Sequence, residues 1–378
     1  MKKVLIAPRK YIQGRGVLGE LGTYLKLLGN KPLVLWDPFV RGLVGETIER
    51  SIAEAGLKLV AVDFAGEATA AERARVGQIA REAGADMAVG IGGGKVLDVA
   101  KAVSVDLKIG MVTCPTIASN DSPTSAASVW YDDNHNFVGF DCWPFNPDIV
   151  LVDTQVVANG PVRAFVAGMG DALSTWVECE AAFKSRAMNI AGGRPTMAAM
   201  MLARLCFETL LEHGLDAKRD VEHHVVTPAV EKVIEANVLL SGLGFESGGL
   251  ATAHMIGNLL SNVAGCQEAG MMHGEKVAFG IVTQLCLDDE MEADEKAAIV
   301  DFEIEIGLPV TFEELNLTGI TREQLMEIGQ ACAGPGSLCH NHPFEITADG
   351  VVDAMIAADA LGRQRRACMS SDECCGGH

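Results

Sequence analysis

The feature that most constrains the fold is a series of short apolar runs in the first 152 residues. Apolar and polar residues do not alternate within these runs, which is typical of strands buried on both faces of a sheet. The segments between them are long enough for crossover helices. The pattern therefore predicts an α/β fold with a mainly parallel, doubly wound sheet. The predicted strands cover residues 33–36, 59–62, 87–91, 111–113 and 149–152.

After about residue 160 the strand-like runs stop and long helical patterns take over. Thr227 followed by Pro228 predicts the start of a helix that runs to Gly242, because Thr is a favoured N-cap and Pro a favoured first residue. We therefore predict two domains, an α/β domain over residues 1–160 and an all-helical domain over 161–378. A further helix is predicted over 195–214, with apolar side chains that we expect to fill the core: Met197, Met200, Met201, Leu205 and Leu211.

Charge and composition exclude several classes of partner. The chain has 30 basic and 50 acidic residues and a formal charge of −20, which disfavours nucleic acid and anionic membranes. No apolar run approaches the ~18 residues that cross a bilayer, and the N-terminus is too polar for a signal peptide. The 11 cysteines lie mostly singly, which suits a reducing compartment, so we expect a cytoplasmic protein. Cys368, Cys374, Cys375 and His378 crowd a tail that we expect to fray rather than bind a metal.

A glycine-rich turn with the sequence GIGGGK occupies residues 90–95, after a predicted strand and before a helical pattern. Backbone N–H groups without obstructing Cβ atoms favour phosphate binding there, although a tight turn without a ligand is the alternative. The turn matches neither the Walker A spacing nor G-x-G-x-x-G. The candidate residues are Gly92, Gly93, Gly94, Lys95 and Asp98.

Polar side chains also follow two other predicted strands, at the sheet edge where ligands bind. Asp37 is placed to accept hydrogen bonds from a ribose diol, which favours NAD over NADP, but an Asp before Pro38 is equally a turn residue. The loop over residues 115–125 carries hydroxyls and one carboxylate, and a polar surface loop is the alternative there. Its candidate residues are Thr116, Ser119, Asp121 and Ser125.

Three candidate metal ligands lie in the helical half, namely Asp171, His254 and His273. Two imidazoles and a carboxylate can hold Zn²⁺ with a fourth position open, as in catalytic zinc sites. Their separations match no short zinc motif, so the spacing does not establish a site. Ordinary structural histidines are the alternative.

Collinear segments along essentially the whole chain resemble the glycerol dehydrogenase branch of the iron-containing, or group III, alcohol dehydrogenase family. The resemblance implies a dehydroquinate synthase-like architecture, with an N-terminal NAD-binding domain, a helical C-terminal domain and a metal ion between them. It also implies a homo-oligomer, with an octamer as the suggested form. The matching segments cover residues 10–14, 90–95 with Asp98, 115–119 with Asp121, 170–173, 235–237, 241–249 and 273–277.

Residue by residue, the resemblance places the family's metal ligands on Asp171, His254 and His273, and its substrate-contacting aspartate on Asp121. Iron-dependent relatives use a further histidine soon after the aspartate, on the same helix. Residues 172–176 contain none, so we expect one Zn²⁺ per subunit rather than Fe²⁺. The family's cofactor contacts fall on Asp37, Gly94, Lys95, Thr116, Ser119, Ser125 and Tyr131.

The resulting hypothesis is an NAD- and zinc-dependent oxidation of a small vicinal diol by hydride transfer, such as glycerol to dihydroxyacetone. Departures from the family pattern at Asn120, Pro123 and Thr124 leave the identity of the alcohol open. A reductase of another small hydroxyketone or a 2-hydroxy acid dehydrogenase is an alternative. A dehydroquinate synthase-like lyase and a non-catalytic scaffold that binds NAD and metal are the other two.

Overall fold

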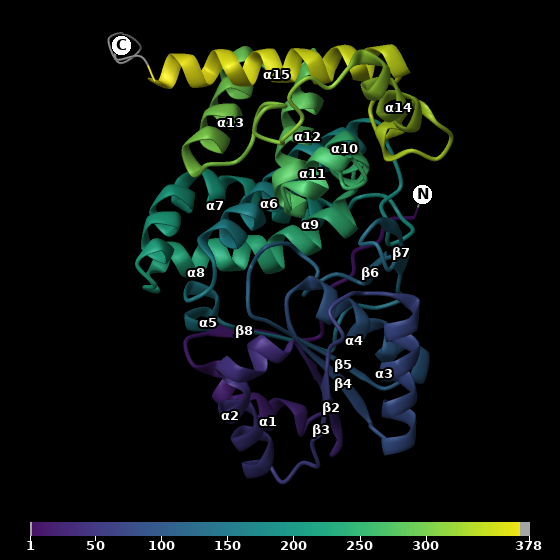
Figure 1. Ribbon diagram of the computed structural model, residues 1–378, viewed down its shortest axis with the longest axis vertical. Coiled ribbons are helices and arrows are strands. Elements are labelled where there is room, and N and C mark those ends of the chain that lie inside the picture. Colours follow the sequence, from purple (N-terminus) through teal and green to yellow (C-terminus); the bar gives the residue numbers. More distant parts are fainter. Residues whose placement is uncertain (1, 371–378) are drawn as a thin grey trace.

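The computed structural model describes residues 2–370, and Cys374, Cys375 and His378 of the predicted tail cluster lie outside this range. Figure 1 shows an α/β layer in the lower half and a helical layer above it. No helix in the described range is both long enough and apolar enough to pass through a bilayer.

Six parallel strands form one sheet, which confirms the predicted fold class. All five predicted strand segments are present, and those at residues 33–36, 87–91 and 149–152 lie in strands that are buried along their whole length. The edge strand β1 was not predicted because its sequence, YIQG, is partly polar and only half-buried. In spatial order the strands are β1 (Tyr11–Gly14), β8 (Ile149–Asp153), β5 (Gly110–Pro115), β4 (Met87–Gly92), β2 (Pro32–Trp36) and β3 (Val60–Asp63).

Helices cover both faces of the sheet, as a doubly wound fold requires. Helices α1 (Leu21–Leu25) and α2 (Pro38–Glu54) lie on one face, and α3 (Ala70–Ala83) and α4 (Gly94–Leu107) on the other (Figure 1). Gly92 at the end of β4 pairs with Pro115 at the end of β5. The glycine-rich turn and the 115–125 loop therefore emerge side by side.

An antiparallel hairpin, β6 (Ala127–Tyr131) and β7 (Phe137–Cys142), projects from the sheet domain and was not predicted. Each strand of the hairpin also donates a backbone hydrogen bond to a residue outside the hairpin. Tyr131 N donates to Ala68 O at 3.0 Å, and Phe137 N donates to Asn262 Oδ1 of the helical half at 3.1 Å. The hairpin thus joins the two halves of the molecule at one end of the cleft between them.

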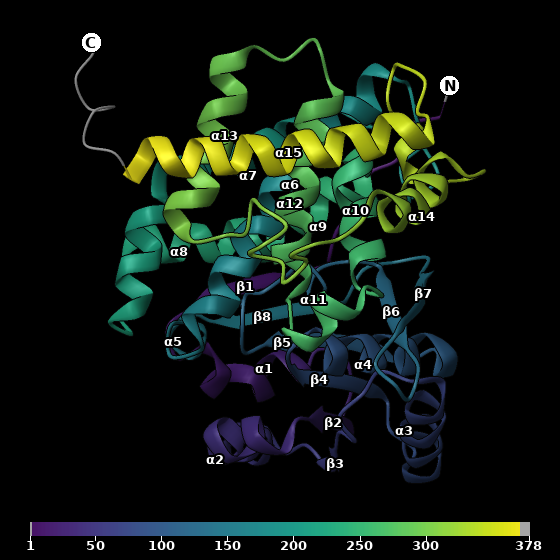
Figure 2. The same cartoon turned by 45° about the horizontal axis from the view of Figure 1, so that its top comes forward.

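The helical half contains helices α6 to α15, and α15 crosses its outer side against α12, α13 and α14 (Figure 2). Thr227 caps α8 as predicted, but a π-helical turn then joins α8 to α9, so the helical segment runs beyond Gly242 to Gly248. The bounds are α5 (Thr154–Ala158), α6 (Val162–Lys184), α7 (Met197–Glu222), α8 (Pro228–Glu235), α9 (Ser241–Gly248), α10 (Thr252–Leu260), α11 (Ala264–Glu268), α12 (His273–Leu287), α13 (Ala293–Ile306), α14 (Arg322–Ala333) and α15 (Ala348–Ser370).

The prediction that the methionine-rich side of α7 fills the core was wrong. Met197, Met201 and Leu205 are 78%, 66% and 49% exposed. The helix instead buries a stripe of smaller residues that includes Ala203 and Cys206, which lets α7 approach α6 and α9 closely. Two apolar stripes run along this helix, and the sequence pattern alone does not tell which one faces the core.

Candidate metal centre and cofactor cleft

Asp171, His254 and His273 come together although they lie on three different helices, α6, α10 and α12. One potential ligand atom from each lies within 4.8 Å of the other two. Oδ1 of Asp171 is 3.4 Å from Nε2 of His254 and 3.3 Å from Nε2 of His273. Both carboxylate oxygens of Asp171 are buried and accept no hydrogen bond within residues 2–370. Buried acceptors without donors fit a bound cation.

The electrostatics of the cluster favour positive charge. Burial acts to raise the pKa of Asp171, but the imidazoles of His273 and His254 outweigh it and hold that pKa below its ordinary value. Burial acts to lower the pKa of His254, yet the carboxylates of Glu178 and Asp171 raise it well above its ordinary value. A divalent cation at this point satisfies the same negative charges without protons on the rings.

Two glycines allow the three elements of the site to pack closely. A Cβ atom on Gly274 would lie 1.8 Å from the carbonyl oxygen of Ala167, and one on Gly168 would lie 1.8 Å from that of Ala118. Helix α12 therefore begins in direct contact with α6, and α6 touches the 115–125 loop. This contact places His273, the residue before Gly274, opposite Asp171.

Glu178 is a site residue that sequence reasoning missed. Its Oε2 lies 2.5 Å from Nδ1 of His254, and its Oε1 accepts from the backbone N of Ala251 and of His254, each at 2.9 Å. A carboxylate on the outer nitrogen of a metal-binding histidine fixes the ring orientation and tautomer. Glu178 follows Asp171 by seven residues, two helical turns on the same face of α6, which is the signal that could have found it.

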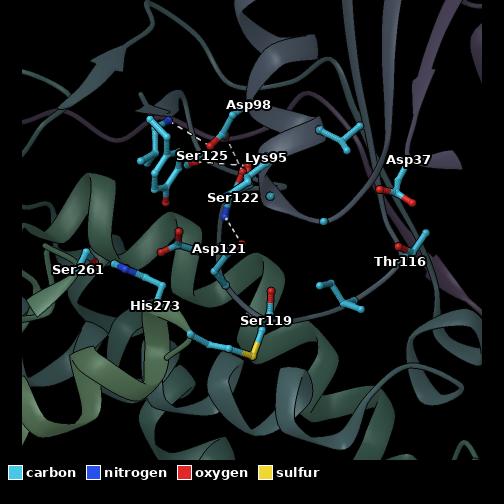
Figure 3. A pocket seen from close by; sticks show the side chains of 18 of the residues that line it. Asp37, Lys95, Asp98, Thr116, Ser119, Asp121, Ser122, Ser125, Ser261 and His273 are labelled. Atoms are coloured by element: carbon cyan, nitrogen blue, oxygen red, sulfur yellow. Dashed lines mark hydrogen bonds between the residues drawn. The ribbon is translucent and has the colours of Figure 1, made fainter. Parts of the chain in front are cut away.

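A cleft of about 1400 Å³ lies between the carboxyl edge of the sheet and the helical half. Figure 3 shows Asp37 and Thr116 at one end of it, with Asp121 and His273 at the other. Gly92 and Asp171 do not line the cleft, since Gly92 belongs to β4 and Asp171 is buried beneath the histidines. The other predicted site residues line it: Asp37, Gly93, Gly94, Lys95, Asp98, Thr116, Ser119, Asp121, Ser125, Tyr131, His254 and His273.

The N-terminus of α4 opens into this cleft at the glycine-rich turn. Gly93 is its N-cap and supplies no capping side chain. A Cβ atom on Gly94 would lie 3.0 Å from Nδ2 of Asn120, and one on Gly93 would lie 3.3 Å from Ile117. The backbone N–H groups at Gly93 and Gly94 thus face the cleft without side chains of their own, at the positive end of the helix dipole. This arrangement fits the pyrophosphate of a dinucleotide.

Two predicted cofactor contacts already have protein partners. Oδ1 of Asp37 accepts from the backbone N of Phe39 and Val40 at 2.8 and 3.3 Å, so this residue caps α2 while it lines the cleft. Nζ of Lys95 donates to Oε2 of Glu67 at 2.6 Å and lies 4.5 Å from the ring centre of Tyr131. Asp37 therefore combines a structural role with its place at the cleft.

Asp98 and Ser125 belong to a buried network that holds the 115–125 loop in place. Asp98 Oδ1 accepts from Ser122 Oγ at 2.7 Å and lies 2.9 Å from Nζ of Lys101. Lys101 is fully buried and also donates to the carbonyl oxygen of Ser122 at 2.8 Å. The carboxylate of Asp98 is therefore occupied within the protein.

Asp121 lies on the same loop, at the end of the cleft where His254 and His273 lie (Figure 3). Its Oδ2 accepts from Ser241 Oγ at 3.3 Å, which links the loop to helix α9. Burial, and then the negative charge of Asp171, raises the pKa of Asp121 well above its ordinary value. The residue is a hydrogen-bonding group placed beside the cluster.

A helix N-terminus suited to an anion and a cluster suited to a cation line the same cleft, and this combination fits a metal-dependent dehydrogenase with a dinucleotide cofactor. Comparison with known proteins gives the same class. The profile of the family described as "Iron-containing alcohol dehydrogenase" matches residues 8–154. A glycerol dehydrogenase from Pseudomonas putida is 44% identical over 96% of this chain and 99% of its own length.

Two further relatives agree. A glycolaldehyde reductase from Halobacterium salinarum is 43% identical over 97% of this chain and 100% of its own length. The crystal structure of glycerol dehydrogenase from Schizosaccharomyces pombe superposes with a TM-score of 0.93 at 34% identity, covering 97% of this chain and 92% of that one. The chain belongs to the iron-containing alcohol dehydrogenase family and is an alcohol dehydrogenase of the type that uses NAD and a metal ion. The comparisons thus favour a dehydrogenase over a lyase or a non-catalytic scaffold.

Proposed function

We propose that this chain oxidises glycerol, or a closely related vicinal diol, to the hydroxyketone with NAD⁺. The observation that carries the proposal is that Asp121 and the cluster of Asp171, His254 and His273 lie at one end of the cleft, with the open α4 terminus farther along it. The name of the P. putida relative supports glycerol as the substrate.

Asp171, His254 and His273 would hold one divalent metal ion. When bound, such an ion supplies a Lewis acid that lowers the pKa of an alcohol. Zinc is the proposed metal, because the helical turn after Asp171 offers hydroxyls rather than a fourth ligand. Thr175 Oγ1 lies 3.2 Å from Ser241 Oγ, and Ser174 Oγ donates to the carbonyl oxygen of Asp171 at 2.7 Å. Three ligands with an open position are typical of catalytic zinc.

Asp121 would orient the diol by accepting a hydrogen bond from the hydroxyl next to the one that reacts, and it is a candidate to accept its proton. Ser241 holds the carboxylate by donating to Oδ2. Because the 115–125 loop is anchored by the buried Lys101, Asp121 keeps a fixed distance from the metal ligands. A rigid second contact selects substrates with two neighbouring oxygen atoms.

The sheet edge would hold the cofactor, and NAD⁺ when bound supplies the hydride acceptor. Asp37 would accept from a ribose hydroxyl of the adenosine half, and the backbone N–H groups at Gly93 and Gly94 would donate to the pyrophosphate. The remaining contacts are proposed along the walls of the cleft: Lys95, Thr116, Ser119, Ser125 and Tyr131.

The domain division at residue 160, the cytoplasmic location and the homo-oligomer are parts of the same proposal. All strands of the sheet end by Asp153, and residues 162–184 already form α6.

The exposed stripe of Met197, Met201 and Leu205 on α7 supports an interface with further copies of the chain, up to the suggested octamer. Cys114, Cys179, Cys206 and Cys266 are buried free thiols, which suits a reducing compartment.

The experiment that tests this function measures NADH formation from NAD⁺ with glycerol, propane-1,2-diol, ethanol and lactate. We expect the vicinal diols to be oxidised with a kcat/KM at least about tenfold above ethanol, because only they can use Asp121 as well as the metal. Absence of NADH with every diol would contradict the proposal. Oxidation of lactate alone would favour the 2-hydroxy acid alternative.

Reduction of a small hydroxyaldehyde is a second candidate, favoured by the similarity to the H. salinarum glycolaldehyde reductase. The same residues serve either direction, since Asp121 can bind the hydroxyl next to a carbonyl as well as one next to an alcohol. Comparing kcat/KM for glycolaldehyde with NADH against that for glycerol with NAD⁺, at one pH, distinguishes the two.

A further inference from the structure

One lysine that lines the cleft, Lys276, takes no part in the proposed reaction. Lys276 lies on α12, three residues after His273, and lines the cleft while only 9% of it is exposed. Its Nζ makes no hydrogen bond or ion pair with any residue in the range 2–370. Burying an ammonium group without a partner costs free energy, so we expect a bound anion to pair with Lys276.

The other lysines near the cleft are paired. Lys95 also lines the cleft, but its Nζ is bonded to Glu67 at 2.6 Å. Lys101, beneath the loop, lies 2.9 Å from Asp98. Of the two lysines that line the cleft in the described chain, Lys276 is therefore the one whose charge is available to a bound anion.

The charges around Lys276 support this interpretation. Burial lowers the pKa of Lys276, and the positive charge of Lys95 acts in the same direction. The neighbouring Glu275 does not neutralise it closely, because its carboxylate oxygens accept from Arg163 at 2.6 and 2.7 Å. Lys95 and Lys276 thus line the same cleft, and of the two only Lys276 lacks a counter-ion within residues 2–370.

We propose that the ammonium of Lys276 pairs with the pyrophosphate of the bound dinucleotide. The inference rests on the proposed function only in taking NAD as the cofactor. Glycerol and dihydroxyacetone are neutral, so the pyrophosphate is the anion that this reaction brings into the cleft. The open N-terminus of α4 receives the pyrophosphate from the sheet side, and Lys276 neutralises it from the helical side.

This pairing gives α12 two tasks. The helix carries the metal ligand His273 at its first residue and the cofactor ligand Lys276 one turn later. Cofactor binding would then place the negative charge of the pyrophosphate against α12, the helix that also carries the proposed metal ligand His273. A phosphate or carboxylate on a substrate is the other anion that fits this ammonium, and binding of ADP-ribose and turnover of glycerate distinguish the two sources of negative charge.

The test measures the affinity for NADH by fluorescence titration and the affinity for ADP-ribose by competition with NADH. Both are measured for the full-length wild type and for the variants Lys276→Met, Lys276→Arg and Lys218→Met. Lys276→Met should weaken both ligands about 10- to 100-fold, the effect of losing one charge-assisted hydrogen bond. Lys276→Arg should stay within a few-fold of wild type. Lys218 lies outside the cleft, 3.6 Å from Glu222, and its variant should bind both ligands normally.

Metal content is the second measurement, because His273 is close in sequence. Lys276→Met should retain as much metal as wild type, which shows that the lost affinity does not arise from a damaged metal site. Weaker binding of NADH with unchanged binding of ADP-ribose would overturn the pairing with pyrophosphate. So would unchanged binding of both ligands together with a raised KM for an anionic substrate such as glycerate. Failure of the wild type to bind NADH would instead contradict the proposed function.

Discussion

Oε2 of Glu178 lies 2.5 Å from Nδ1 of His254, and Nε2 of the same ring lies 3.4 Å from Oδ1 of Asp171. One buried carboxylate thus holds the imidazole at Nδ1, while Nε2 faces the other two candidate metal ligands, Asp171 and His273. Such an outer carboxylate raises the basicity of the ligand and selects its tautomer. The proposed metal centre therefore includes a fourth side chain, Glu178, that is not itself among the proposed ligands.

Replacing Glu178 with Gln should weaken metal binding by about 10- to 100-fold, because the amide keeps the volume but loses the negative charge. Competition with a chelator of known affinity measures this. Glu180→Gln, on the same helix but partly exposed and 3.7 Å from Lys184, is the matched control and should bind metal like wild type. Equal metal affinity in the Glu178 and Glu180 variants would show that Glu178 does not position the ring.

Gly274→Ala should lower both stability and metal content, since the new Cβ would lie 1.8 Å from the carbonyl oxygen of Ala167. Helix α12 must then move away from α6, and His273 moves with it. Gly77→Ala on α3 is the opposite case, because nothing beyond the adjoining backbone of its own helix lies within 4 Å of its Cβ position. That variant should gain up to about 1 kcal/mol from helix propensity. Thermal melts and metal analysis of both variants check the pair.

Asp37→Asn should reduce discrimination against NADP⁺ while the fold keeps its stability. The amide oxygen can still accept from the backbone N of Phe39 and Val40, but it no longer repels a 2′-phosphate. Asp37→Ala loses the cap as well and should be less stable by about 1 kcal/mol. The measurement is the ratio of kcat/KM for NAD⁺ and NADP⁺, with melting temperatures alongside. An unchanged ratio in Asp37→Asn would remove Asp37 from the cofactor site.

Glu246 should make stability fall as pH rises. Burial raises its pKa to about 7, although hydrogen bonds from Ala126 N and Asn146 and the charge of Lys101 oppose the shift. An unfolded Glu has a pKa near ~4.3, so the folded chain binds this proton more tightly. Its contribution is complete below pH ~4.3 and is lost as pH rises through about 7, a change on the order of 3 kcal/mol.

Glu246→Gln cannot titrate, so its stability should fall less than that of wild type between pH 5 and pH 8. Melting temperatures of both proteins across that range check the difference. Parallel curves for the two proteins would mean that Glu246 keeps an ordinary pKa in the folded chain.

The sheet was predictable because strands buried on both faces leave an unbroken apolar run, as in residues 33–36 and 149–152. The hairpin was not, since β7 half-buries Gly139 and Asp141 while Val138 and Phe140 are exposed, so its apolar residues do not mark its inner face. The stripe that α7 buries was also assigned wrongly, because small residues such as Ala203 face the neighbouring helices there while the methionines face outward. Burial on that helix depends on its neighbours.

The candidate site divides in the same way. The family resemblance points to Asp171, His254 and His273, and the fold brings these three residues together. Their spacing in the sequence alone does not predict a site, because they lie on three helices that loops and turns separate. Glu178 and Lys276 were missed since their roles depend on what faces them in space. The sequence also gives no sign that Lys95 is paired with Glu67.

The most direct test of the central claim is the metal content of purified wild type and His254→Ala, measured together with NADH binding and glycerol oxidation. We expect one zinc ion per wild-type chain and NADH formation from glycerol. We expect His254→Ala to lose both metal and turnover while it still binds NADH at the sheet edge. A His254→Ala protein that oxidises glycerol at the wild-type rate after chelation would contradict the account.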